Sequence, residues 1–154
     1  MNLYYIILII FIKIIYKIFN IENTTKIINN IYIGNFISSF YANENNYDII
    51  INVSKELPFF TNKINIRIPI DDNYIFKNKD LLKFIDIINL ISNIKNKKIL
   101  IHCRMGIQRS CFITQLILIK KYDMTFNKSY NLIKKKRNIS FLPYHNFKYI
   151  YEII

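Results

Sequence analysis

The sequence predicts an α/β fold in which a sheet of four to five strands is flanked by helices. Two patterns predict it: short runs of apolar or alternating residues, typical of strands, are separated by longer runs with apolar residues at helical spacing. A third observation supports a folded domain, because 52% of the 154 residues are hydrophobic, too many for a disordered chain and enough for a core. The expected strands cover residues 27–33, 48–53, 64–70 and 98–102.

The charge and the cysteine content limit the partners and the compartment. Twenty-two Lys and Arg against ten Asp and Glu give a net charge of +12, which attracts phosphate-bearing partners. Because no basic stripe alternates with stacking aromatic residues, no specific nucleic-acid partner is expected. The low counts of two Cys and two Gly exclude a disulfide scaffold and a collagen. We therefore expect a reducing, cytoplasmic location.

Residues 1–21 are the most apolar stretch, and we expect them to form an apolar N-terminal helix, so that the chain divides into 1–25 and 26–154. The charge-free run ends at Lys13, short of the ~18 to 20 residues that a membrane span needs. Polar residues at helical spacing predict one polar face, made of Lys13, Tyr16, Lys17 and Asn20.

Three roles remain open for this helix. It docks on its own domain or on a second copy of it, it anchors the chain in a membrane, or it is a removed signal peptide. The signal peptide is the weakest alternative, because no basic region precedes the apolar run. For an anchor, the lysines on its C-terminal side would keep the rest of the chain in the cytoplasm.

The remaining elements follow from local patterns. The first strand is expected to enter a turn at Gly34, and a short helix over 38–46 precedes the second strand. Strict alternation marks the third strand, where Pro69 indicates an edge or an exit, and a continuous apolar run marks a buried strand ending at His102. The expected helices cover 79–94, 109–122, 125–136 and 143–153.

The segment from Ile99 to Ser110 carries the chemistry. A buried strand ends at His102, a short loop follows, and a helix begins near Arg109, which is where an α/β fold binds an anion. The loop amides can converge on a ligand as a nest, and the thiolate of Cys103 is the reactive form of the nucleophile at their centre. Arg109 can hold two phosphate oxygens with its planar fork, and Gly106 supplies backbone torsions that other residues avoid.

This segment resembles the signature loop of the cysteine-dependent protein tyrosine phosphatases, with His before Cys-x5-Arg and Ser after it. Further segments fall in the order and spacing of the dual-specificity subfamily, a resemblance that covers roughly residues 26–152; they are Tyr32–Asn35, Ile51–Ser54 with Glu56 and Pro58, Ile68–Asn73, and Arg137–Ser140. The resemblance implies a central mixed, largely parallel sheet and a shallow pocket that accepts phosphoserine and phosphothreonine as well as phosphotyrosine.

The resemblance also implies the role of each site residue. Cys103 would attack phosphorus, Asp72 would act as general acid and then general base, Ser110 would assist departure of the sulfur, and His102 would orient the loop. No metal or other cofactor is implied. The phosphate would be held by the loop residues Arg104, Met105, Gly106, Ile107, Gln108 and Arg109.

Several positions have a second interpretation. Asp71 adjoins Asp72 and could supply the acid instead, although the pattern favours Asp72, which directly precedes Asn73. Cys111 is interpreted as a small core residue, or as the partner of Cys103 in a regulatory disulfide. A surface position is expected for His145, and a solvated face for the cluster 134–137.

Two residues depart from the subfamily pattern. Gln108 replaces the usual Ser or Asn, and Phe141 stands where Pro often follows Ile-Ser. Neither change removes a catalytic atom.

The expected function is dephosphorylation of proteins at tyrosine and at serine or threonine, so phosphorylated proteins are the expected partners. Arg104, a cation directly after the nucleophile, is typical of relatives that act on phosphoinositides, which keeps a phosphoinositide or RNA 5′-phosphate phosphatase as the alternative. A phosphate-binding pseudophosphatase is the alternative outside the enzymes, and the intact Cys103, Arg109, Ser110 and Asp72 argue against it. Through residues 1–21, association with a membrane or with a second copy is also expected.

Overall fold

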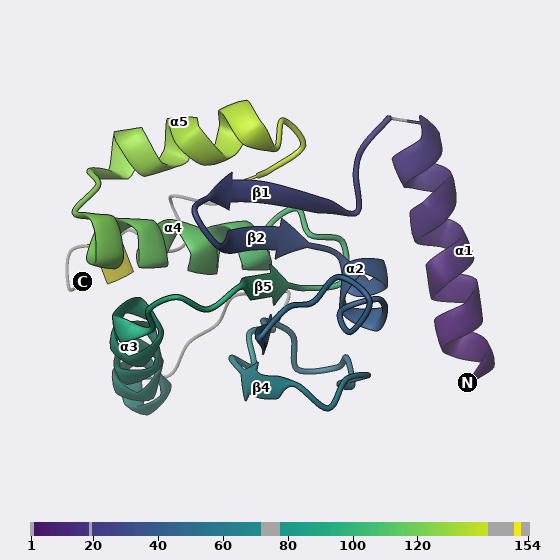
Figure 1. Cartoon of the computed structure of the whole chain (residues 1–154), viewed down its shortest axis with the longest axis horizontal. Coiled ribbons are helices and arrows are strands. Elements are labelled where there is room, and N and C mark those ends of the chain that lie inside the picture. Colours follow the sequence, from purple (N-terminus) through teal and green to yellow (C-terminus); the bar gives the residue numbers. More distant parts are fainter. Residues whose placement is uncertain (1, 19, 72–77, 142–149, 152–154) are drawn as a thin grey trace.

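The computed structural model describes residues 2–18, 20–71, 78–141 and 150–151. A five-stranded sheet with the order β1-β2-β5-β3-β4 lies at its centre (Figure 1). Strand β1 pairs antiparallel with β2, and the other neighbouring strands pair in parallel, so the expected mixed, largely parallel sheet is confirmed. The strands are β1 (Thr24–Ile28), β2 (Ile31–Gly34), β3 (Ile49–Asn52), β4 (Ile64–Arg67) and β5 (Ile99–His102).

The described helices agree closely with the expected ranges after residue 78. Helix α4 has the expected bounds, and Thr125 caps α5 by accepting a hydrogen bond from the backbone N–H of Lys128. The expected last helix, 143–153, falls mostly outside the described residues, although 150 and 151 are helical. The helices are α1 (Leu3–Ile18), α2 (Phe36–Phe40), α3 (Asn78–Asn93), α4 (Arg109–Tyr122) and α5 (Phe126–Lys136).

Alternate residues of the central strands build the cores on the two faces of the sheet. Ile49 and Ile51 of β3 join the main core with Phe112 and Leu116 of α4. Ile50 of β3 points the other way, into a smaller cluster whose buried members also include Ala42, Tyr47 and Leu100. Both faces of β3 and β5 are thus buried, which explains why these strands are continuous apolar runs.

Two expectations at the start of the domain were wrong. The segment 27–33 is a hairpin rather than one strand, with Asn29 in the left-handed region at φ 43°. Isoleucines on both sides of the Asn29-Asn30 pair hid this turn. The short helix begins at Phe36 instead of 38, because the Asn35 side chain caps it by accepting a hydrogen bond from Ser38 N (3.1 Å), and it ends at Phe40.

Gly34 is required by packing and not by a turn, contrary to expectation. It ends β2 and has no positive φ. A Cβ at this position would lie 2.0 Å from Ser38 Oγ and 2.9 Å from the Leu100 side chain. Glycine therefore lets α2 approach the sheet closely at the end where the loop after β5 begins.

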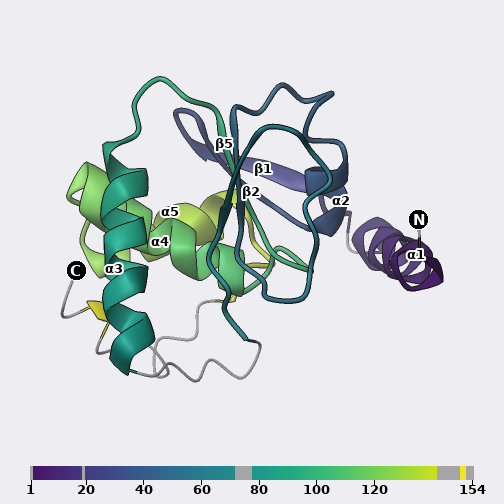
Figure 2. The same cartoon turned by 90° about the horizontal axis from the view of Figure 1, so that it is seen from below.

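Helix α1 docks on its own domain. Figures 1 and 2 show it beside α2, at the end of the molecule toward which β2 and β5 point. The buried residues Leu8, Ile12 and Tyr16 recur every fourth position and pack with Phe36, Ile37 and Leu57. The predicted polar face was wrong in one respect, because Tyr16 belongs to the buried face while Lys13 and Lys17 are exposed.

The outer face of α1 remains apolar and exposed. It includes Leu3, Ile7, Ile10, Ile14 and Ile18. Among the described residues, no helix has the length and hydrophobicity needed to cross a bilayer. Association of this face with a membrane surface or with a second copy stays a prediction.

Candidate active site

The loop after β5 wraps around the sulfur of Cys103. All four residues of β5 are buried, and the strand delivers Cys103 to a position where its side chain is only 3% exposed. The backbone N–H of Gly106 donates to the Cys103 Sγ at 3.2 Å, and Ser110 Oγ lies 3.4 Å from the same sulfur. Hydrogen-bonding groups from both the loop and the first turn of α4 thus face the sulfur.

Gly106 is required by both its torsions and its neighbours. Its φ is +65°, and a Cβ would lie 2.6 Å from the Gly34 carbonyl oxygen and 2.8 Å from Arg137 Nη2. The torsional reason expected from the sequence is therefore confirmed, and the two glycines of the chain turn out to be in contact.

Hydrogen bonds from residues outside the loop to its backbone carbonyls hold the loop in shape. Four consecutive carbonyls accept hydrogen bonds from residues beyond the loop. The pairs are Phe36 N to Arg104 O (3.0 Å), Tyr16 Oη to Met105 O, Arg137 Nε to Gly106 O (2.7 Å) and Phe141 N to Ile107 O (2.8 Å). With the carbonyls engaged outside, the amides are available to the interior of the loop, as that of Gly106 shows.

Phe141 explains one departure from the subfamily pattern. Its backbone N–H makes one of these four bonds, and proline at this position has no N–H to donate. The other departure, Gln108, is the N-cap residue of α4, and its side chain makes no capping hydrogen bond.

Arg109 is the first residue of α4 and is buried. Its Nη1 and Nη2 donate to the two carboxylate oxygens of Glu56 at 3.1 and 2.9 Å, and Nη1 also donates to the Ile70 carbonyl at 3.1 Å. A two-point contact of this kind sets the plane of the guanidinium group. Burial acts to raise the pKa of Glu56, but the hydrogen bonds and charge of Arg109, with a contribution from Arg104, outweigh it and lower the pKa.

Glu56 is a site residue that the sequence interpretation missed. It stood in a motif segment without a role, and only its position beside Arg109 in the folded chain reveals one. Arg104 lies at the rim, where its Nε is 3.6 Å from Glu56 and its Nη2 donates to Tyr4 Oη at 2.9 Å.

A cavity of about 380 Å³ opens over the loop. One wall comes from Phe11 of α1, a residue that the sequence interpretation did not place at the site. The other lining residues are Cys103, Arg104, Met105, Ile107, Gln108 and Arg109. Five of the six predicted phosphate-binding residues therefore line one cavity, and Gly106 is not among its lining residues.

His102 is buried completely at the end of β5, and neither ring nitrogen has a hydrogen-bond partner among the described residues. Burial lowers the pKa of His102 to about 3; the backbone of Cys103 opposes this shift, and the charges of Arg67 and Arg109 add to it. The ring is therefore neutral at neutral pH and does not exchange protons with a substrate in that range.

The burial of His102 predicts an acid-sensitive stability. Its folded pKa lies below the value of 6.5 in an unfolded chain, so the unfolded state takes up the proton first and stability falls as pH drops from 6.5 toward 3. Between about pH 7.5 and about pH 5, this one group should lower the free energy of unfolding by about 2 kcal/mol. Urea unfolding at both pH values measures the loss, and His102→Gln should remove it. An equal pH dependence in the two proteins would contradict the assignment.

Cys111 is a core residue. Both cysteines are free thiols, so the alternative disulfide with Cys103 is not formed in this structure. Burial raises the pKa of the Cys111 thiol to about 12, partly offset by the nearby charge of Arg137. The thiol thus stays protonated, and its sulfur faces the Gly106 carbonyl at 3.7 Å.

The assignment of the acid stays a prediction, because Asp72 lies outside the described residues, as does His145. Asp71 is exposed and pairs with Lys55 at 3.5 Å. This contact gives Asp71 a partner on the surface.

The expectation of a solvated face over 134–137 was wrong at its last residue. Arg137 is only 2% exposed and donates four hydrogen bonds within the described part of the chain, all to neutral groups. Lys134 also bends back, and its Nζ donates to the Ser140 carbonyl at 2.6 Å. The run of positive residues concealed this, since a cation is expected at the surface unless tertiary partners receive it.

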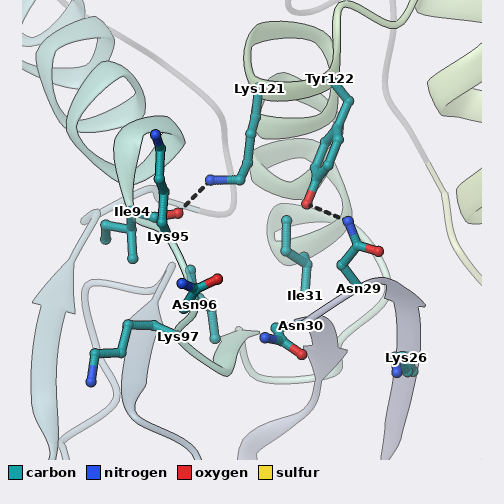
Figure 3. Close-up of a pocket in the computed structure, with 11 residues that line it drawn as sticks. Lys26, Asn29, Asn30, Ile31, Ile94, Lys95, Asn96, Lys97, Lys121 and Tyr122 are labelled. Atoms are coloured by element: carbon teal, nitrogen blue, oxygen red, sulfur yellow. Dashed lines mark hydrogen bonds between the residues drawn. The ribbon is translucent and has the colours of Figure 1, made fainter.

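A second cavity, of about 510 Å³, lies at the other ends of the parallel strands (Figure 3). Lys26, Lys95, Lys97 and Lys121 line it, and its lining residues include no cysteine. Lys121 Nζ donates to the Ser92 carbonyl (2.8 Å) and to that of Ile94, where α3 ends. Lys121 is thus engaged with the carbonyl end of α3.

Comparisons with known proteins identify the family of this chain. Residues 31–153 match the family model described as the catalytic domain of dual specificity phosphatases. The chain is 30% identical over 123 residues to the tyrosine phosphatase-like protein 123R of Invertebrate iridescent virus 6, covering 76% of this chain and 82% of that protein. It is 35% identical over 109 residues to human dual specificity protein phosphatase 7, covering 64% of this chain but only 24% of that longer protein. The crystal structure of human DUSP28 superposes with a TM-score of 0.74 at 14% identity, over 86% of this chain and 95% of that one.

Proposed function

Because the chain belongs to the dual specificity phosphatase family and is thus a protein phosphatase, we propose that it hydrolyses both phosphotyrosine and phosphoserine or phosphothreonine through a phosphorylated cysteine. One observation carries the proposal: the sulfur of Cys103 lies within hydrogen-bonding distance of both Gly106 N and Ser110 Oγ, and Arg109 lines the same cavity as Cys103. In this arrangement the nucleophile, the amide donor and the guanidinium group can all act on one phosphoryl group. The proposed location is the reducing cytoplasm, where such a thiolate stays reduced.

In the first step, the Cys103 thiolate attacks phosphorus, an S–P bond forms and the bond to the leaving oxygen breaks. The loop amides and Arg109 stabilise the charge on the three equatorial oxygens of the loose transition state. Glu56 keeps the plane of the Arg109 guanidinium group fixed, which lowers the reorganisation needed during transfer. Asp72 donates its proton to the leaving oxygen, so that a neutral alcohol or phenol departs.

In the second step, water attacks the cysteinyl phosphate. The Asp72 carboxylate takes a proton from the water, the S–P bond breaks and inorganic phosphate is released. Ser110 supports the departing sulfur, since its hydroxyl lies 3.4 Å away and can donate to the thiolate that re-forms. The buried, neutral His102 acts only through the position of the strand and loop.

The observations favour protein substrates over the alternatives. Arg104, the residue that suggested a phosphoinositide, is engaged by Glu56 and by Tyr4 at the rim, which reduces its availability to a second phosphate group. A pseudophosphatase would not require the close sulfur, amide and hydroxyl arrangement around Cys103. Phosphoinositide and RNA 5′-phosphate remain outcomes of the test.

The test compares substrates at equal concentration with the full chain. We expect release of inorganic phosphate from phosphotyrosine peptides and from phosphoserine or phosphothreonine peptides. A phosphoinositide or triphosphate-ended RNA cleaved with a higher kcat/KM than every peptide would overturn the proposed substrate class. A protein that binds the peptides and hydrolyses none of these substrates would overturn the enzyme assignment.

A further inference from the structure

Helix α1 reaches the phosphate-binding loop, although it precedes the residues that match the catalytic-domain family. Three of its aromatic residues meet the site at different points. The hydroxyl of Tyr4 accepts a hydrogen bond from Arg104 at the rim, Phe11 lines the cavity and Tyr16 contacts the loop backbone. Among them, Tyr16 has the contacts with the clearest chemical consequence.

The hydroxyl group of Tyr16 both donates and accepts a hydrogen bond. It donates to the Met105 carbonyl and accepts from Arg137 Nη2 at 2.7 Å. The side chain is buried, and burial raises the pKa of Tyr16, while the charge of Arg137 acts in the opposite direction. The hydroxyl therefore keeps the proton that it donates to the loop.

Arg137 continues this chain of contacts to the next residue of the loop. Its Nε donates to the Gly106 carbonyl at 2.7 Å, and its Nη1 donates to Thr25 Oγ1 (2.7 Å) and to the Glu22 carbonyl (3.1 Å). Within the described residues, no carboxylate pairs with this buried cation. Tyr16 and Arg137 thus hold two successive loop carbonyls from the same side.

We propose that Tyr16 is a positioning residue of the phosphate-binding loop, so that α1 contributes to the catalytic site by maintaining the shape of this loop. The proposal rests on the proposed function and names a residue outside the matched catalytic domain. By holding the Met105 carbonyl outward and seating Arg137 against Gly106, Tyr16 maintains the loop shape in which the Gly106 amide meets Cys103 Sγ.

The contrast with Tyr5 separates this role from simple helix packing. Tyr5 also lies on α1 and packs against Phe36 and Phe60, with ring centroids 5.6 and 5.9 Å apart. Its hydroxyl makes no hydrogen bond among the described residues. Removing a hydroxyl from each tyrosine therefore compares loss of the loop contact with an equal chemical change on the same helix.

The experiment uses full-length wild type, Tyr16→Phe and Tyr5→Phe. It measures kcat and KM for p-nitrophenyl phosphate, binding of inorganic phosphate by calorimetry, and the rate at which iodoacetate alkylates Cys103 at neutral pH. We expect Tyr16→Phe to weaken phosphate binding and to lower kcat by about tenfold each, the effect of one lost buried hydrogen bond. Alkylation should slow as well, because the loop amides no longer converge on the sulfur, whereas Tyr5→Phe should match the wild type in all three measurements.

The phosphate-binding and alkylation measurements do not depend on turnover. If wild type fails to hydrolyse any substrate, the proposed function fails, and these two measurements still test Tyr16. If Tyr16→Phe loses thermal stability but keeps wild-type phosphate affinity and alkylation rate, Tyr16 is only a packing residue and the inference is wrong. Equal losses in Tyr5→Phe and Tyr16→Phe would overturn it too, because they would assign the effect to helix docking as a whole.

Discussion

Replacing Cys103 by Ser should lower kcat for p-nitrophenyl phosphate by about 10⁴-fold or more, the scale on which enzymes lose activity with their nucleophile. The hydroxyl that replaces the thiol remains protonated at neutral pH, so no attacking anion forms in the phosphate-binding loop. The loop amides and Arg109 do not depend on the sulfur for their positions, since carbonyl contacts and Glu56 hold them from outside. Cys103→Ser should therefore still bind inorganic phosphate.

The matched control is Cys111→Ala, which removes the other thiol of the chain. Cys111 is buried, and its pKa of about 12 keeps it from acting as a nucleophile. Its replacement should leave kcat within about threefold of wild type, with a stability loss of about 1 kcal/mol from the smaller side chain. Mass spectrometry of acid-quenched wild type should show phosphate on the peptide that contains Cys103. Unchanged turnover in Cys103→Ser would refute the cysteinyl-phosphate mechanism.

Replacing Asp72 by Ala should lower kcat by about 10² to 10⁴-fold, the usual contribution of a general acid. The loss should grow with the basicity of the leaving group, because a strongly basic oxygen depends most on the proton. Substrates with a series of substituted phenols provide this test. Steady-state kinetics should show a steeper dependence of kcat/KM on leaving-group pKa in Asp72→Ala than in wild type.

Asp71→Ala is the control for this experiment. Asp71 is exposed and pairs with Lys55, so its removal should change kcat little, because exposed ion pairs contribute weakly. If Asp71→Ala shows the steep dependence and Asp72→Ala does not, the two carboxylates exchange roles. If neither variant shows it, the acid lies elsewhere in the chain.

The elements around the loop could be predicted because their signals are local. The bounds of α4 follow from the change at Arg109 from loop residues to a helical run, and β5 follows from the short apolar run that ends at His102. Gly106 could be assigned a torsional role because a glycine in a turn before a helix indicates a backbone conformation that other residues avoid. These assignments depend on neighbours in sequence, and the spacing from Cys103 to Arg109 predicts a nucleophile and a phosphate-binding arginine in the same way.

Other parts of the site could not be predicted, because their partners are distant in sequence. Glu56 meets Arg109 only when the segment after β3 folds over the first turn of α4. Arg137 was interpreted as one more surface cation in a run of positive residues. It is buried instead, and it donates hydrogen bonds to the Gly106 carbonyl and the Tyr16 hydroxyl. Tyr16 was assigned to a polar helix face, although its polar atom is satisfied inside the protein and not by water.

By itself, the sequence predicted the chemistry that we propose for this protein: a thiol, an arginine and a hydroxyl at spacings that place all three at the carboxyl end of one strand and the first turn of one helix. The tertiary structure alone decided what holds that chemistry in shape. A loop of backbone amides is useful only while its carbonyls are engaged elsewhere, and their donors come from α2, from the segment after α5 and from α1. Hydrogen-bond satisfaction of buried backbone groups is a property of the whole fold, and no local pattern records it.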